Sequence, residues 1–273
     1  MISRLATICL VVAAAIAPAL AQWNDGWFRH PPRFATSEDL EQGSFTFCRL
    51  HYTSVRNEQL GHGWNTDYPD SDANFMVRLA QLTHAQVNLD RDGEPNHVVV
   101  RATDDLLFSC PFLFMSDVGT TGFEPREVDR LRDYLLAGGF LYVDDFWGNA
   151  AWEHWSGEIG KVLPPDEYPI VDIPLDHELF KALYDVPGVP QVPSIQHWMW
   201  SGGTTSERGW ESATPHCRGI FDHDGRLMVV MTHNTDIADG WEREGESEEF
   251  FELFSLPKSY PMGINIVMYA LTH

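Results

Sequence analysis

The chain has 273 residues, of which 44% are hydrophobic and 21% are charged, and its formal net charge is −22. Such an acidic surface repels nucleic acid and anionic lipid headgroups, because both bind proteins through basic patches. The composition therefore excludes a nucleic-acid-binding protein. The negative charge either keeps the protein soluble or attracts cations, and we favour solubility as its main role.

The first 21 residues have the features of a secretory signal peptide. Arg4 precedes an apolar run at 5–17, and Ala19-Leu20-Ala21 is typical of a cleavage site. The run is too short to span a membrane comfortably, and no later segment has spanning length. We therefore expect residues 1–21 to be removed. The mature protein is expected to be exported, to the periplasm or out of the cell, without a membrane span.

Three cysteines follow the predicted leader: Cys48, Cys110 and Cys217. An odd number allows at most one internal disulfide. Cys48 lies within an apolar strand pattern and Cys110 directly precedes another, and buried cysteine commonly acts as a small hydrophobic residue. We therefore favour three buried, unpaired thiols over a disulfide.

The rest of the chain is predicted to form an N-terminal arm and one domain. Residues 22–44 are polar and show little periodicity, whereas residues 45–273 alternate between strand and helix patterns. Strands are predicted at 45–52, 85–89, 111–116, 140–143, 168–173, 218–221 and 226–232, and helices at 70–83, 124–137, 152–163 and 261–271. This order predicts the α/β class, as a three-layer α/β/α sandwich around a mostly parallel sheet. Residues 174–218 are the least regular part, and we expect them to be an insertion over one end of the sheet.

One stretch predicts where a site lies. After Gly138-Gly139, the apolar strand at 140–143 ends in Asp144-Asp145. In open α/β sheets ligands bind beyond the carboxyl ends of the strands, so these two carboxylates are candidates for a site. Neighbouring residues on a strand point to opposite faces, so both can reach one ligand only if the strand breaks there. The alternative is that one of them caps the following helix.

Polar residues follow other predicted strands in the same way. The loop at 61–69 follows the first strand, and its glycine, proline and aromatic residues suit contact with a ligand. Asp176-His177 follows the strand at 168–173, although Asp176 could instead cap a helix. The polar run after the last strand could instead hydrogen-bond to its own backbone. The candidate ligand-binding residues are Trp64, Asp67, Asp144, Asp145, His177, His233, Asn234, Asp236, Asp239, Trp241 and Glu242.

These side chains suit a divalent cation. Carboxylates and imidazoles together bind several divalent metals, while sets of oxygen ligands suit Ca²⁺ or Mg²⁺. The candidate metal ligands are Asp144, Asp145, His177, His233 and Asp236. Because parallel strands end at one edge of a sheet, we expect these residues and Asp67 to converge there. No motif fixes the reaction, since His-Glu-x-x-His, the P-loop and Gly-x-Gly-x-x-Gly are all absent.

Tryptophans are a further signal. Five of them are predicted in loops near the strand ends: Trp64, Trp147, Trp198, Trp200 and Trp241. Exposed rings there could stack on sugars. We favour the alternative, in which the rings pack the long loops onto the domain.

Four motifs resemble one protein family. They are Gly-Gly-Phe-Leu-x-Val-Asp-Asp at 138–145, Pro-Leu-Asp-His at 174–177, Arg-Leu-Met-Val-Val-x-x-x-Asn-x-Asp-x-x-Asp-x-Trp-Glu at 226–242, and Gly-x-Asn-x-x-x-Tyr-Ala-Leu-Thr-His at 263–273. The chain from about residue 45 onward resembles the bacterial domain of unknown function 4159 family. The resemblance implies a fold similar to class I glutamine amidotransferases, which is flavodoxin-like. It implies no reaction.

Two functions are compatible with these observations. The amidotransferases place a cysteine nucleophile in a Gly-x-Cys-x-Gly turn, and this chain has none. We therefore favour an exported module of unknown activity that binds a small molecule, a glycan or a protein partner without turnover. The alternative is a metal-assisted hydrolase that acts on a glycan or peptide, with metal-bound water as the nucleophile.

Overall fold

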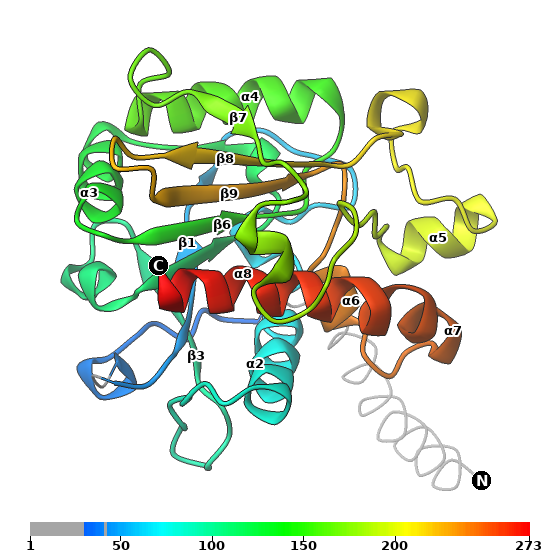
Figure 1. Cartoon of the computed structure of the whole chain (residues 1–273), viewed down its shortest axis with the longest axis horizontal. Helices are drawn as coiled ribbons and strands as arrows, with labels where there is room; N and C mark the ends of the chain where they lie inside the picture. Colours follow the sequence, from blue (N-terminus) through cyan, green and yellow to red (C-terminus); the bar gives the residue numbers. More distant parts are fainter. Residues whose placement is uncertain (1–29, 41–42) are drawn as a thin grey trace, which may run out of the picture. The chain divides into compact units, whose positions relative to one another are not determined.

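The computed structural model describes residues 30–40 and 43–273, of which residues 32–273 form one compact unit (Figure 1). The predicted signal peptide lies outside the described residues. In the part of the chain that is described, no helix combines the length and the apolar character needed to cross a membrane.

A seven-stranded sheet forms the centre of this unit, in the order β3-β1-β4-β6-β9-β8-β7 (Figure 1). Its strands are β1 (Phe47–His51), β3 (His97–Arg101), β4 (Phe112–Met115), β6 (Phe140–Val143), β7 (Ile170–Asp172), β8 (His216–Phe221) and β9 (Leu227–His233). The strands from β3 to β9 in this order are parallel, and β8 runs antiparallel to both of its neighbours. The prediction of a mostly parallel sheet is confirmed.

Helices cover both faces of the sheet. The main helices are α2 (Asp70–Leu82), α3 (Pro125–Leu136), α4 (Gly148–Val162), α5 (Ile195–Ser201), α6 (Asp239–Glu242), α7 (Glu248–Phe250) and α8 (Tyr260–Thr272). Strand residues alternate between two apolar cores. Phe114 and Tyr142 join the core that contains residues of α2 and α8, whereas Leu113 and Leu141 join the core that contains residues of α3 and α4. The predicted three-layer sandwich is therefore confirmed.

The edge strand β3 corrects one prediction. The strand predicted at 85–89 is wrong, because Val87 and Leu89 form only isolated bridges. The true strand lies further on and includes three consecutive buried valines, at 98–100. A short run that is buried on both faces lacks the alternation by which strands are recognised. The backbone of Ala35 lies along this edge, donating a 2.9 Å hydrogen bond to Val99 O.

The cysteines correct a second prediction. Cys48 and Cys110 form a disulfide with a Cα–Cα distance of 6.1 Å, while Cys217 is free and buried. Cys48 lies on β1 and Cys110 lies just before β4, the neighbouring strand. Sheet order, which the sequence alone does not give, brings the two residues within bridging distance.

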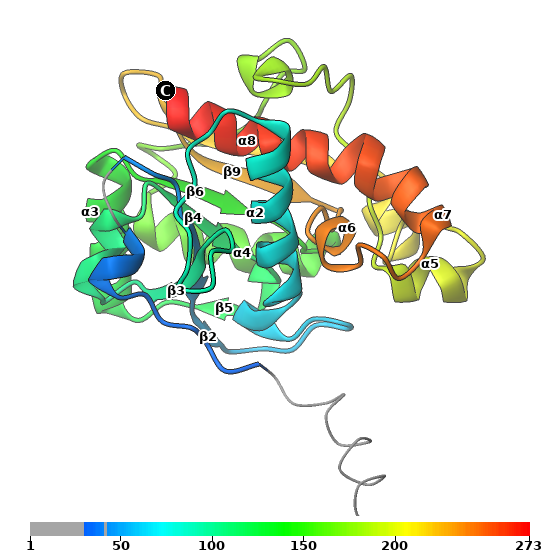
Figure 2. The same ribbon diagram turned by 90° about the horizontal axis from the view of Figure 1, so that it is seen from below.

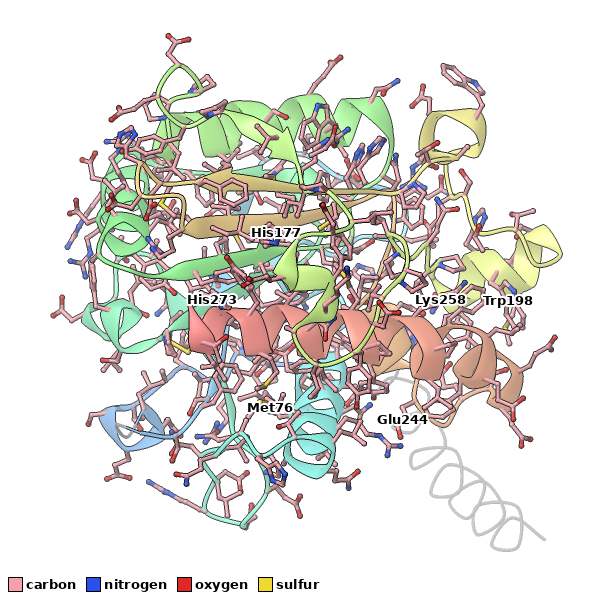
Figure 3. The ribbon with its side chains drawn as sticks, in the orientation of Figure 1. Met76, His177, Trp198, Glu244, Lys258 and His273 are labelled. Carbon is pink, nitrogen blue, oxygen red and sulfur yellow. A yellow bond between two sulfur atoms is a disulfide. The ribbon has the colours of Figure 1, made fainter. Side chains whose placement is uncertain are left out.

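The part of the segment 174–218 that carries α5 lies beyond the carboxyl ends of the parallel strands, where α5 is labelled in Figure 1. It is tied to the loop after β9, because Asp236 N donates to Val192 O at 2.8 Å and Val192 N donates to the Thr235 hydroxyl at 2.9 Å. The ring of Trp198 packs against Phe250 and Phe254 (Figure 3). The prediction of an insertion over one end of the sheet therefore holds for the part around α5. It does not hold for residues 178–184, which pack on α8, or for His216–Arg218, which belong to β8.

The C-terminal helix has an unpredicted extension. A nine-residue π-helical segment, Phe251–Ser259, joins α7 to α8 in one continuous helical run (Figure 2). It contains Pro257, whose missing N–H and ring disfavour a regular α-helix. The π-helical segment contacts α6, the short helix that follows β9.

Candidate functional site

Three neighbouring strands leave the sheet in the same way at its carboxyl edge. Within two residues of the ends of β4, β6 and β9, the chain adopts a left-handed backbone at Asp117 (φ 52°), Asp145 (φ 53°) and Asn234 (φ 62°). Asp67, in the loop between β1 and α2, has φ 63°. Asp and Asn tolerate this conformation better than other non-glycine residues. The backbone thus turns sharply beyond each strand and leaves polar side chains at one edge.

Asp144 faces the layer formed by α2 and α8. Its Oδ2 accepts a 2.9 Å hydrogen bond from Ala238 N, and its Oδ1 accepts one from the Thr232 hydroxyl. Both oxygens therefore have protein donors, and the side chain fastens the loop after β9 to the end of β6. This contact confirms the predicted convergence of the Asp-Asp stretch with the loop at 233–239.

Asp145 belongs to a different group. One carboxylate oxygen from each of Asp67, Asp145 and Asp236 lies within 4.8 Å of the other two, and we call these residues the central triad. Their exposed fractions are 9%, 9% and 3%. From the described residues each carboxylate accepts one side-chain or backbone hydrogen bond: from the Ser116 hydroxyl, from Trp147 Nε1 and from Asp239 N, respectively. Three acidic side chains from three separate segments thus converge in a buried position.

Burial makes the charged form of the central triad costly. It raises the pKa of Asp67 to about 6 and raises the pKa values of Asp145 and Asp236 well above their usual range. The charged groups that act most strongly on Asp145 and on Asp236 are other carboxylates, which raise both pKa values further. The three carboxylates of the triad are therefore unfavourable together in their charged form unless a proton or a cation balances them.

A second group shares Asp67 with the central triad. Asp67, Asp239 and Glu242 also offer oxygens within 4.8 Å of one another, and we call these residues the lateral triad. A positively charged side chain lies beside this triad: Arg243 Nε is 2.6 Å from Glu242 Oε2 and 3.6 Å from Asp239 Oδ1. The closer contact is an ion pair without hydrogen-bond geometry, because neither atom makes a hydrogen bond to the described residues. Burial raises the pKa of Glu242 to about 8, and Arg243 opposes that rise.

His233 and Asn234 lie at the same edge, but their side chains contact Gly148, the first residue of α4. His233 packs on Phe146 with ring centroids 4.8 Å apart, and its Nε2 lies 3.1 Å from Gly148 O. Burial lowers the pKa of His233 to about 3, so its ring is neutral. Asn234 Oδ1 accepts a 2.8 Å hydrogen bond from Gly148 N, and its Nδ2 donates to Thr214 O. Neither side chain belongs to the two triads.

His177 lies at the other end of the sheet. Its ring packs against Tyr269 and against Phe221, which is paired with the first residue of β9. Its Nδ1 accepts a hydrogen bond from Leu179 N and so caps a short 3₁₀ helix. The chain reverses through a turn closed by His177 N and Pro174 O. The prediction that His177 joins the other residues at the carboxyl edge is therefore wrong.

The tryptophans among the candidates are packing residues. Trp241 is 1% exposed and contacts Phe75, with ring centroids 4.4 Å apart. Trp64 lies against His51 and Tyr68. Packing, the alternative favoured from the sequence, describes both rings.

Glu207 lies near the site and was not predicted. Its side chain is 3% exposed, and its charge helps to raise the pKa of Asp145. Its Oε1 accepts a 2.7 Å hydrogen bond from Ser194 N, within the insertion. Ile195 N, at the start of α5, donates to Asp239 Oδ2 at 2.9 Å. The insertion thus contacts the acidic residues directly, although its irregular sequence carries no pattern that would reveal this.

Comparison with protein families assigns the whole domain to one family. Residues 46–271 match the family model described as Domain of unknown function (DUF4159), as the four motifs predicted. A comparison with curated proteins finds no match. The match covers all the residues of both triads, but it carries no reaction or ligand that could be transferred to them.

Proposed function

We propose that this chain, which belongs to the DUF4159 family, is an exported module that binds a divalent cation through the central triad. The observation that carries the proposal is the convergence of Asp67, Asp145 and Asp236 in a buried position. Burial of like charges is costly unless an opposite charge balances them. A divalent cation supplies that balance.

The donor set favours a hard cation. The triad offers carboxylate oxygens alone, and such sets suit Ca²⁺, Mg²⁺ or Mn²⁺ rather than metals that prefer sulfur or imidazole. His233, the nearest histidine in sequence, faces α4 and its ring is held there by stacking. The negative surface of the protein, with a formal charge of −22, would also raise the local concentration of cations.

The proposal includes binding but no turnover. Cys217 is the free cysteine of the described residues, and it lies in β8 with 3% exposure. Burial raises the pKa of its thiol well above the usual range, so it is not an activated nucleophile. This supports a binding module that lacks the amidotransferase cysteine.

Cation binding can be tested by calorimetry. Protein stripped with a chelator is titrated with Mn²⁺, Ca²⁺ or Mg²⁺, and we expect a saturable heat that Asp145→Asn or Asp236→Asn removes. Both substitutions keep the size of the side chain and an oxygen acceptor. Asp133→Asn, which removes an exposed carboxylate from α3, is the matched control and should bind as the wild type does. Absence of binding, or equal binding by all variants, would refute the proposal.

Export is the second part of the proposal. The disulfide between Cys48 and Cys110 supports it, because disulfides persist in oxidising compartments and are rare in the cytosol. Mature protein should begin at Gln22. Under denaturing conditions it should show one titratable thiol before reduction and three afterwards. An intact mass that retains residues 1–21, or three thiols without reduction, would contradict export.

A further inference from the structure

The arrangement of the two triads determines how many cations the site can hold. They share Asp67, and in each triad the three oxygens lie within 4.8 Å of one another. A carboxylate shared between two such sets could bridge two metal ions, as in two-metal centres, where the ions lie about 3.5–4 Å apart. The geometry of the carboxylates alone would therefore allow two cations.

Arg243 changes this geometry on one side. It directly follows α6, and its backbone N–H donates to Asp239 O at 3.0 Å. Its Nε lies against Glu242 and Asp239, and its guanidinium also donates to Glu246 Oε1 at 2.9 Å. The side chain is 24% exposed, so most of it lies within the protein. A permanent positive charge is thus held between two members of the lateral triad.

We propose that Arg243 is a built-in counter-ion that fills the lateral triad and limits the centre to a single divalent cation, bound at the central triad. The inference rests on the proposed cation site and adds its stoichiometry and the residue that sets it. The guanidinium cannot lose its proton in the physiological range. A second dication at the lateral triad would have to displace it from both carboxylates against like-charge repulsion.

Removal of Arg243 should open the second position. In Arg243→Met the lateral triad keeps three carboxylates and loses its base, so we expect two Mn²⁺ per chain instead of one. Arg243→Lys keeps the positive charge and should stay at one. Arg78→Met is the matched control, because Arg78 pairs with Glu244, outside both triads, and it should also bind one.

The measurement is Mn²⁺ stoichiometry with electron paramagnetic resonance on the full chain. Wild type saturated with Mn²⁺ should give the hyperfine spectrum of an isolated ion, whereas Arg243→Met should give a spin-coupled pair. A coupled pair in the wild type, or one ion in folded Arg243→Met, would overturn the role of Arg243 while leaving the cation site intact. If Arg243→Met does not fold, the wild-type spectrum alone still shows whether the site holds one ion or a coupled pair. No bound Mn²⁺ in the wild type would instead overturn the proposed function itself.

Discussion

Two buried charged groups of this protein are built on opposite plans. Arg49 and Asp72 are both fully buried, and they form an ion pair between β1 and α2. Arg49 also donates to Trp64 O, Thr66 O and the Ser71 hydroxyl, so its donors are satisfied. The central triad gathers three carboxylates, and in two of them, Asp145 and Asp236, the strongest charged neighbours are acidic. Only Asp67 is influenced most by bases, Arg49 and Arg243.

The difference separates a structural group from a site for a ligand. A buried ion pair that is fully hydrogen-bonded needs nothing further, and removing one partner leaves an uncompensated charge. Uncompensated carboxylates gain stability when they bind a proton or a cation. The comparison therefore predicts opposite signs: loss of an acid should destabilise the first group and stabilise the second in the absence of metal.

The largest effect is expected at the compensated pair. Asp72→Ala leaves Arg49 buried without its partner, so the free energy of unfolding should fall by about 3–5 kcal/mol. Urea denaturation measures this loss. Asp70→Ala, an exposed acid in the first turn of the same helix, should cost about 1 kcal/mol or less.

A double variant tests the reason for that loss. Replacing both partners, with Arg49→Met and Asp72→Leu, removes the unpaired charge and should recover much of the stability that Asp72→Ala loses. If the double variant were as unstable as the single one, lost packing rather than an unpaired charge would explain the effect.

The acidic edge should give the metal-free protein an unusual pH dependence. Burial raises the pKa values of Asp117 and Asp144 from 3.8 to about 7. The folded state therefore binds protons more tightly than the unfolded state, and this contribution to stability is complete below about pH 4. It is lost as the pH rises through about 7. We expect the free energy of unfolding to fall by about 2–4 kcal/mol between pH 5 and pH 8 in chelator.

Cation should reverse this trend, because metal binding requires deprotonated carboxylates. Thermal denaturation at several pH values, with chelator or with saturating Mn²⁺, measures both effects. Stability of the metal-free protein that rises from pH 5 to pH 8 would show that the buried acids are not protonated in the folded state. That result would remove the contrast between the two groups.

The sequence predicts the position of the acidic edge well. Asp144-Asp145 and the run at 233–239 each follow an apolar strand, and parallel strands bring such positions together. The structure confirms this convergence through the contact of Asp144 with Ala238. The sequence cannot predict which of the two residues, Asp144 or Asp145, belongs to the triad, because that depends on the left-handed backbone at Asp145.

Other features need tertiary information. The disulfide between Cys48 and Cys110 requires the order of β1 and β4 in the sheet. His177 was misplaced because the chain reverses directly after β7, which a single Asp-His pair does not reveal. Arg243 follows an acidic run and resembles an ordinary surface base until its contacts with Asp239 and Glu242 are seen.

The smallest effect, and the most specific, is expected from Asp145→Asn. Asparagine tolerates the left-handed backbone at this position and keeps the oxygen that accepts from Trp147 Nε1. The substitution therefore removes a buried charge with little change in shape. Because burial and neighbouring carboxylates raise the pKa of Asp145 well above its usual range, its charged form is unfavourable, and we expect metal-free Asp145→Asn to be more stable than wild type at pH 8. Urea denaturation in chelator, with Asp133→Asn as the control for net charge, measures the difference.

With saturating Mn²⁺ the order should invert, because wild type gains binding free energy that the variant lacks. A variant less stable than wild type in chelator would mean that the Asp145 carboxylate is already compensated, and the triad would then be a structural group like Arg49 and Asp72.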